Sequence, residues 1–286
     1  MTSLVKNILV VGAGQMGTGI AQVFASSNFQ VTLVDLNEEI LNNAKTTIIK
    51  SISRLVDKEL VTPSAKSEIL ENLTFSTSLD IAKGFDLVVE AIIENLTAKK
   101  SLFQQLETIC PLDTIFASNT SSFSITELSP SSQRSSKMIG MHFFNPPTRM
   151  KLIEVIKGAK TSEETFSKVM ELAKTINKTP IPVIESAGFI VNRLLASFLN
   201  EAYFMLQEGI SSIEDIDNAV KLGLRHPMGP FELSDFIGLD TMLFIIEYLH
   251  DEFGEDKYRP CPLLKKMVRS GDLGRKTGQG FYSYGD

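Results

Sequence analysis

One histidine and one glutamate stand out in the segment MIGMHFFNPPTRMKLIEVI, residues 138–156. His142 ends one apolar run, Pro146 and Pro147 follow, and Glu154 lies in a second apolar run. A carboxylate that accepts a hydrogen bond from one imidazole nitrogen fixes the tautomer and leaves the other nitrogen to exchange a proton. If the two runs are strands that fold back on each other, the pair is an acid–base dyad. Otherwise the histidine is structural and the glutamate is an exposed strand residue.

A second chemical signal is the sequence GAGQMG, which lies between the apolar run Ile8 to Val11 and a run with helical spacing. The first glycine permits a tight turn, the second lets the backbone approach a pyrophosphate, and the third lets the helix pack on the strand. The helix N-terminus directs its N–H groups at the phosphates. The alternative is an α/β turn without a ligand. The favoured prediction is dinucleotide binding by Gly12, Ala13, Gly14, Gln15, Met16 and Gly17.

An acidic residue, Asp35, follows the next predicted strand, residues 30–34. A carboxylate at this point accepts hydrogen bonds from the ribose hydroxyls of NAD and repels the 2′-phosphate of NADP. The predicted cofactor is therefore NAD. With NAD as the hydride acceptor, a histidine base would remove the hydroxyl proton of an alcohol, so the chemistry fits an alcohol–ketone couple.

Strand and helix patterns alternate in the part of the chain that contains these residues. Apolar strand runs at residues 86–92 and 114–122 flank a helical pattern at residues 97–109. This alternation predicts an α/β fold with a doubly wound, Rossmann-type sheet. Ligands bind beyond the carboxyl ends of such strands. The side chains predicted to lie there are Glu90, Glu94, Lys99, Asn119, Ser121 and His142.

Residues 38–73 form a charged, amphipathic insertion with apolar positions at helical spacing. Pro63 interrupts the pattern, and a second short helix is predicted from Ala65 to Leu70. A single crossover helix would need fewer residues. The basic side chains of the insertion are either a solvated face or contacts for a phosphorylated substrate. They are Lys45, Lys50, Arg54 and Lys58.

The alternation stops near Ile190, and the patterns that follow are helical. We therefore predict a Rossmann-type domain at residues 1–186 and an all-helical domain at residues 187–286. Asn192 lies in the first turn of the first of these helices, where asparagine is often only a local polar residue. The segment IGLDTMLFIIEYL is apolar on more than one face, which indicates burial by another helix or by a second subunit. A homodimer is the expectation.

Composition and charge exclude several classes of protein. The 286 residues are 43% hydrophobic and 22% charged, and the net charge of -6 with dispersed basic residues predicts no nucleic-acid partner. Cys110 and Cys261 form no CxxC and no metal-ligand cluster, so we expect no disulfide framework and no metal. No apolar run is long enough to span a membrane, and the first strand pattern leaves no room for a secretory leader. A cytoplasmic location without a membrane partner is expected.

An ordered set of segments over nearly the whole chain resembles the short-chain L-3-hydroxyacyl-CoA dehydrogenases. The resemblance implies an NAD-binding first domain and a helical second domain that contributes to substrate binding and forms the dimer. It also implies reversible oxidation of (S)-3-hydroxyacyl-CoA, with 3-hydroxybutyryl-CoA favoured, to the 3-ketoacyl-CoA in fatty acid β-oxidation or butanoate metabolism. The segments are GAGQMGTGIAQVFA, VEAIIENLTAKKSLFQQL, FASNTSSFSITEL, GMHFFNPPTRMKLIEVI, ESAGFIVNRLL, HPMGPFELSDFIGLD and GRKTGQGFY.

The same resemblance implies roles for individual residues. His142 becomes the general acid/base and Glu154 its partner, and Ser121 and Asn192 hydrogen-bond the substrate or His142. The less usual sequence Pro-Pro-Thr-Arg after Asn145 leaves the shape of that loop open. Positions that match NAD contacts are Asp35, Glu94, Lys99, Ser121, Asn145 and Lys276, and positions that match CoA contacts are Ser51, Lys58 and Ser121.

Two alternatives stay open at the level of sequence. A protein of the same fold can bind NAD without catalysis, because a fold does not guarantee activity. A dehydrogenase of free hydroxy acids or sugar acids could use a similar two-domain plan. CoA-dependent turnover separates the favoured hypothesis from both.

Overall fold

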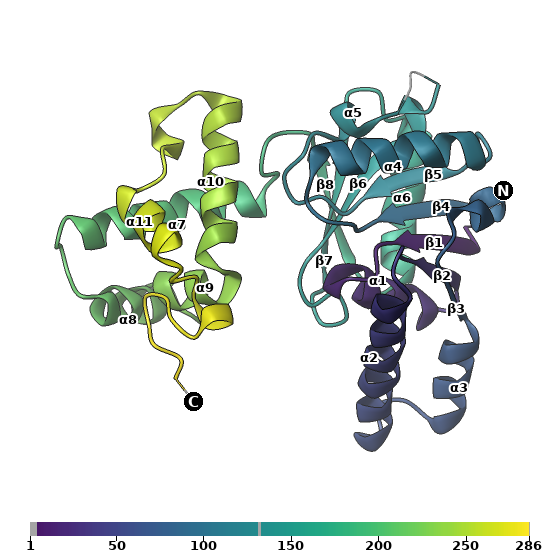
Figure 1. Ribbon diagram of the computed structural model, residues 1–286, viewed down its shortest axis with the longest axis horizontal. Coiled ribbons are helices and arrows are strands. Elements are labelled where there is room, and N and C mark those ends of the chain that lie inside the picture. The colour runs from purple at the N-terminus through teal and green to yellow at the C-terminus, as the bar shows by residue number, and fades with distance from the viewer. Residues whose placement is uncertain (1–4, 131–132, 286) are drawn as a thin grey trace. The chain divides into compact units, whose positions relative to one another are not determined.

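The computed structural model describes residues 5–130 and 133–285. The chain divides into two compact units, and the division falls between Glu185 and Ser186 (Figure 1). Among the described residues, the first unit contains the sheet and six α-helices, whereas the second is helical apart from isolated bridges near its end. Each unit has its own hydrophobic core.

The first unit is built on an eight-stranded sheet with the order β3-β2-β1-β4-β5-β6-β7-β8. All neighbouring strands are parallel except β6 and β7, which are antiparallel. The strands are β1 (Asn7–Val11), β2 (Gln30–Val34), β3 (Leu73–Ser76), β4 (Leu87–Glu90), β5 (Ile115–Ser118), β6 (Met138–Phe143), β7 (Leu152–Lys157) and β8 (Thr179–Ile184). The predicted doubly wound, Rossmann-type sheet is confirmed.

Helices lie on both faces of this sheet (Figure 1). Their bounds are α1 (Gln15–Ala25), α2 (Glu38–Asp57), α3 (Pro63–Glu71), α4 (Leu96–Ile109), α5 (Ile125–Leu128) and α6 (Glu163–Thr175). Alternate strand residues face opposite layers: Ile8 and Val10 join the core formed with α1 and α6. On the other face, Phe116 of β5 stacks on Phe103 of α4 with 5.6 Å between ring centroids. Burial from both sides explains why the central strands are continuously apolar.

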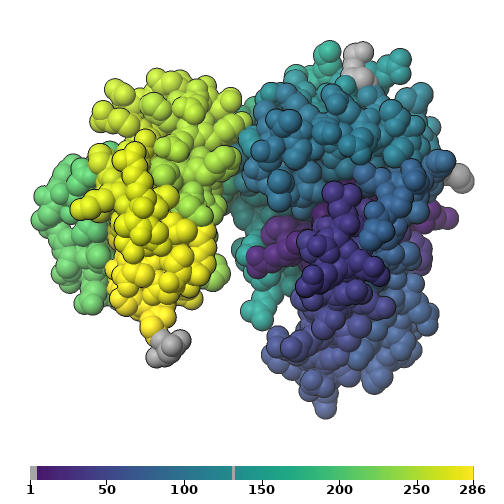
Figure 2. Space-filling view, in the orientation of Figure 1, coloured from purple at the N-terminus to yellow at the C-terminus, as the bar shows by residue number. Residues whose placement is uncertain are grey.

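The α2–α3 arm extends away from the sheet (Figure 1, Figure 2). Asn37 caps α2, because its side chain accepts hydrogen bonds from the first turn. The helical pattern is interrupted as predicted, because α2 ends at Asp57 and a second helix, α3, follows. Thr62 caps α3 and Pro63 takes its first position, where a missing N–H costs no hydrogen bond. The chain then forms β3, a strand of four residues that the sequence pattern did not reveal because it is too short to alternate.

The second unit is helical, as predicted, and contains five α-helices among the described residues. They are α7 (Val191–Gln207), α8 (Ile213–Gly223), α9 (Pro230–Ile237), α10 (Leu239–Phe253) and α11 (Pro262–Ser270). Helix α10 packs against α7, α9 and α11 around an apolar core. Buried Asp235 accepts hydrogen bonds from the backbone of Phe281 and Tyr282 and from the hydroxyl of Tyr284. The glycine-rich C-terminal segment is thereby tied to α9.

Candidate active site

The strand return brings His142 and Glu154 together. In the antiparallel pair β6–β7 the two residues are direct partners in the register. The imidazole Nδ1 lies 2.7 Å from Oε2 of Glu154, and the residues are only 6% and 1% exposed. An ionised carboxylate can only accept hydrogen bonds, so Nδ1 carries the proton of this bond. The geometry is that of an imidazole whose tautomer and orientation are fixed by a carboxylate.

The loop between β6 and β7 is held from two sides. Lys178 donates hydrogen bonds to the carbonyls of Pro147 (2.5 Å) and Met150 (2.7 Å), and burial lowers the pKa of this lysine. On the other side the loop meets α1: a Cβ built on Gly19 would lie 2.9 Å from Cδ of Pro147. Asn145 belongs to this loop, so the loop that carries a predicted NAD contact packs on the helix that follows the glycine-rich turn.

Each glycine of the turn after β1 meets a different physical demand. Gly12 has a φ of 101°, and a Cβ there would lie 2.5 Å from the carbonyl oxygen of Ala91. A Cβ on Gly17 would lie 1.7 Å from the carbonyl oxygen of Gly12. At Gly14, in contrast, no heavy atom of the described residues would lie within 4 Å of an added Cβ, apart from those of Gly14 and its two chain neighbours. Gly14 is also the N-cap of α1 and has no side chain to cap it. The turn therefore fits a pyrophosphate bound by helix N–H groups.

Asp35 lies beside the same turn. The N–H of Ala13 donates to Oδ2 of Asp35 at 2.8 Å, and the N–H of Asn37 donates to Oδ1 at 3.3 Å. The carboxylate is half-buried at the end of β2, next to the turn. A fixed acceptor in this place fits the ribose hydroxyls of NAD, whereas a 2′-phosphate would meet a like charge. The residues present therefore fit NAD.

A buried charged cluster lies at the carboxyl ends of β4 and β5. Lys99 is 1% exposed and donates to Oε1 of Glu90 at 2.5 Å; its Nζ also lies 3.2 Å from Oε2 of Glu94. Oε1 of Glu94 accepts hydrogen bonds from the hydroxyl of Thr120 (2.6 Å) and from the N–H of Ser121 (2.9 Å). Lys99 is too deeply buried to offer much surface to a cofactor. Lys99 instead forms an ion pair with Glu94, and Glu94 accepts the hydrogen bonds that fix the segment containing Ser121.

The remaining predicted site residues are distributed over both units. Ser51 lies on α2 and its hydroxyl accepts a hydrogen bond of 3.0 Å from buried Gln22, while Lys58 is exposed at the C-cap of the same helix. In the second unit, Asn192 lies in the first turn of α7 and is 9% exposed. Lys276 is exposed and forms an ion pair with Asp240.

Some supporting residues were not identified from the sequence. Gln22 and Lys178 carry no local signal, since a polar side chain on a helix or near an edge strand is ordinarily solvated. Ser118 and Thr120 flank predicted residues, and only the structure places their hydroxyls against Glu90 and Glu94.

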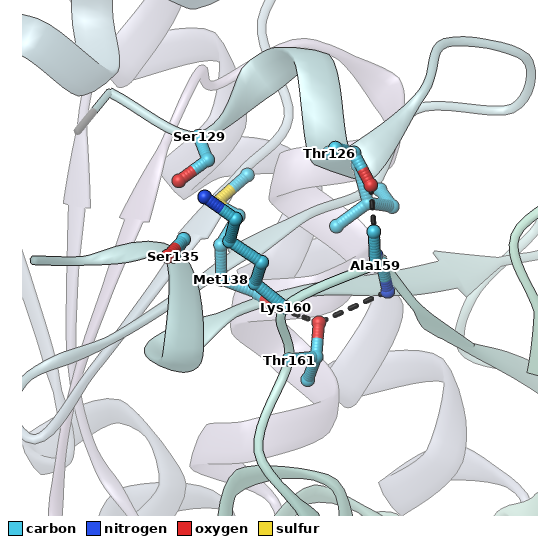
Figure 3. A pocket seen from close by; sticks show the side chains of 9 residues that line it. Thr126, Ser129, Ser135, Met138, Ala159, Lys160 and Thr161 are labelled. Carbon is cyan, nitrogen blue, oxygen red and sulfur yellow. Dashed lines mark hydrogen bonds between the residues drawn. The ribbon is translucent and has the colours of Figure 1, made fainter. Parts of the chain in front are cut away.

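A pocket of about 260 Å³ lies at the other end of β6, where Met138 begins the strand (Figure 3). Its hydroxyl groups are used by the chain itself: Thr161 donates to the carbonyl of Met138, and Thr126 donates to Glu185 at 2.5 Å. The same hydroxyls also accept hydrogen bonds from backbone N–H groups, Thr126 from Ala159 and Thr161 from Gly158 (Figure 3). The pocket belongs to the end of the strand opposite the dyad, and we assign it no role in the chemistry.

Both cysteines are buried, and burial raises the pKa of the Cys110 thiol to about 11, against the opposing effect of Arg134. Cys261 is fully buried and its pKa is raised for the same reason. Because the thiolate is the reactive form, we expect neither thiol to react with a disulfide reagent at about pH 8 in the folded protein, and both to react in denaturant. Rapid labelling of the native protein would contradict this assignment.

Membrane-spanning helices and metal sites are both absent from residues 5–130 and 133–285. No helix in these ranges is long and apolar enough to cross a membrane. Nor do they contain a group of three or more His, Cys, Asp and Glu side chains arranged to hold a metal ion.

A dinucleotide-binding turn and an oriented histidine on one sheet are the parts of an NAD-dependent oxidoreductase. Family models agree: residues 7–186 match the NAD binding domain of 3-hydroxyacyl-CoA dehydrogenase, and residues 188–284 match its C-terminal domain. The chain belongs to the 3-hydroxyacyl-CoA dehydrogenase family and uses NAD as its cofactor.

Individual relatives are similar over nearly their full length. The chain is 50% identical to a probable 3-hydroxybutyryl-CoA dehydrogenase of Deinococcus radiodurans, covering 96% of this chain and 99% of the relative. It is 47% identical to a probable 3-hydroxybutyryl-CoA dehydrogenase of Bacillus subtilis, covering 98% of each. The crystal structure of (S)-3-hydroxybutyryl-CoA dehydrogenase from Ralstonia eutropha matches with a TM-score of 0.96 and 44% identity, covering 99% of this chain and 100% of that one.

Proposed function

We propose that this NAD-dependent dehydrogenase interconverts (S)-3-hydroxybutyryl-CoA and acetoacetyl-CoA, with His142 as general acid/base. The observation that carries the proposal is the 2.7 Å contact between His142 and Glu154 on the sheet that also bears the dinucleotide-binding turn. The four-carbon substrate is the one in the names of the similar bacterial proteins.

In the oxidative direction, Nε2 of His142 removes the proton of the substrate hydroxyl, and Glu154 stabilises the resulting imidazolium through Nδ1. NAD, when bound, accepts the hydride. In the reverse direction the imidazolium returns the proton to the ketone oxygen. Ser121 and Asn192 are assigned to hydrogen-bond the substrate or His142, and they orient the carbon that reacts.

Cofactor contacts are assigned to the turn after β1, to Asp35 and to Glu94 and Asn145, with Lys276 from the second unit. Lys99 is assigned to position Glu94 through their ion pair. Ser51 on α2 and Lys58 at its C-cap are assigned to CoA, which gives the α2–α3 arm a function. The division into an NAD-binding domain at residues 1–186 and a substrate-binding, dimerising domain at residues 187–286 is part of the proposal. So are the homodimer, a cytoplasmic location and a role in fatty acid β-oxidation or butanoate metabolism.

The direct test is oxidation of NADH by the purified protein in the presence of acetoacetyl-CoA. We expect rapid turnover with acetoacetyl-CoA and NADH, and turnover slower by about tenfold or more with NADPH, because Asp35 opposes the 2′-phosphate. Free acetoacetate is the matched control for the CoA moiety and should be a poor substrate. Equal rates with acetoacetyl-CoA and with free acetoacetate would favour a dehydrogenase of free hydroxy acids. Tight NADH binding without turnover would favour a non-catalytic protein.

A further inference from the structure

Glu90 has more partners than a strand residue needs. It is fully buried at the last position of β4. Its Oε1 accepts hydrogen bonds from Lys99 (2.5 Å) and from the N–H of Ile92 (2.8 Å), and its Oε2 accepts one from the hydroxyl of Ser118 (2.5 Å). Nothing in the proposed chemistry accounts for a charge at this depth, where an unpaired carboxylate would be strongly disfavoured.

The partners of Glu90 indicate its ionisation state. Burial raises the pKa of Glu90, and the ammonium of Lys99 together with these hydrogen bonds opposes the rise. Lys99 and the N–H of Ile92 can only donate. The hydroxyl of Ser118 donates to Oε2 of Glu90 and accepts a hydrogen bond from the N–H of Thr120 at 3.1 Å. The arrangement is that of a carboxylate that accepts from every one of these groups.

The cluster formed by Glu90, Lys99 and Glu94 therefore carries one net negative charge, since it contains two carboxylates and one ammonium. Lys99 is almost fully buried, and the side chain of Glu94 is 29% exposed. Most of this charge is therefore buried. Electrostatic interactions of buried charges are stronger than those of charges at the surface.

The sheet order places this cluster relative to a bound dinucleotide. In the proposed placement of NAD, the turn after β1 would hold the pyrophosphate, and Asp35 at the end of β2 would hold the adenosine ribose on one side of it. β4 and β5 lie on the other side of β1. The nicotinamide half must then extend over the carboxyl ends of β4 and β5, where Glu94 and Ser121 lie. Its ring carries a positive charge in NAD⁺ and none in NADH.

We propose that the Glu90–Lys99–Glu94 cluster is an electrostatic device that favours the oxidised cofactor, with Glu90 as a positioning residue that supplies its net charge. This inference rests on the proposed placement of NAD in the site. By stabilising NAD⁺ relative to NADH, the cluster sets the balance between the two forms on the enzyme, and so the equilibrium between bound hydroxyacyl and ketoacyl substrates.

The test is the ratio of the Kd of NAD⁺ to the Kd of NADH in a Glu90→Gln variant. Glutamine keeps the shape: its amide oxygen can accept from Lys99 and Ile92, and its NH₂ can donate to Ser118. The substitution removes the net charge of the cluster, so we expect this ratio to rise roughly tenfold. NADH binding is followed by its fluorescence, and NAD⁺ by displacement of NADH.

Asp86→Asn is the matched control. Asp86 precedes β4 at its other end and accepts hydrogen bonds from the N–H groups of Lys6 and Asn7, so the variant also removes a carboxylate charge. Its ratio should equal that of the wild type. In a double variant, Glu90→Gln with Lys99→Met, the cluster regains one net negative charge, and the ratio should return towards the wild-type value. A purely structural role for Glu90 would not produce this reversal.

An unchanged ratio in folded Glu90→Gln that still binds NADH would overturn the inference. If that variant does not fold, Glu94→Gln removes the same charge at a partly exposed position, and an unchanged ratio there is equally decisive. These titrations need no substrate. A wild-type protein that binds NADH without turning over acetoacetyl-CoA would contradict the proposed function, not the inference about the cluster.

Discussion

Replacing His142 with alanine is expected to lower kcat by about 10² to 10⁴, the usual cost of losing a general acid/base. The dissociation constant for NADH should change little, because the dinucleotide-binding turn and Asp35 are separate from β6. Steady-state kinetics with acetoacetyl-CoA and a fluorescence titration with NADH measure the two quantities. A variant that keeps near-normal kcat would show that His142 is a structural histidine.

A substitution of the other residue of the dyad, Glu154, should lower kcat by a smaller factor. Glu154→Gln keeps an oxygen that can accept from Nδ1 of His142 but removes the charge that stabilises the imidazolium, so its loss of kcat should be smaller than that of His142→Ala. His250, on α10 with its side chain 36% exposed, provides the control histidine. His250→Ala should leave both kcat and NADH binding unchanged.

Gly17→Ala should give the largest loss of cofactor binding. A methyl group there would lie 1.7 Å from the carbonyl oxygen of Gly12, so either the turn or α1 must move. We expect the Kd for NADH to rise by about tenfold or more. Such overpacking also lowers the free energy of unfolding by roughly 1 to 3 kcal/mol. Calorimetry of binding and urea unfolding measure the two effects.

Gly84→Ala is the control for this substitution. Gly84 is exposed, and among the described residues no heavy atom outside its own short helix and its chain neighbours lies within 4 Å of an added Cβ. Its stability and NADH affinity should match the wild type. If Gly17→Ala behaved in the same way, the close approach of α1 to the turn would not be required for binding.

Much of the first unit could be predicted because its signals are local. A buried parallel strand is a continuous apolar run, and a glycine-rich turn between such a strand and a helix is a specific sign of dinucleotide binding. Asp35 followed from its place after the next strand. The dyad required one further step, since His142 and Glu154 meet only if the chain returns as a strand. The spacing allowed that return without requiring it.

The supporting contacts could not be predicted in the same way. In the sequence, Glu90 is simply the polar end of an apolar strand, and only the fold shows that Lys99, from the next helix, reaches back to it. The hydrogen bond from Lys178 to the loop after β6 depends on the pairing of β7 with β8. Such contacts join residues through tertiary packing, which leaves no periodic trace in the chain.

The contact between Gly19 and Pro147 has an evolutionary consequence. A Cβ at position 19 would lie 2.9 Å from the Pro147 ring, so the helix that follows the dinucleotide-binding turn and the loop that follows the histidine strand cannot vary independently. Relatives with a larger residue at position 19 need a differently shaped loop around position 147. The two positions should therefore covary among homologues, and exchanging either segment alone between relatives would create a mismatch that exchanging both would avoid.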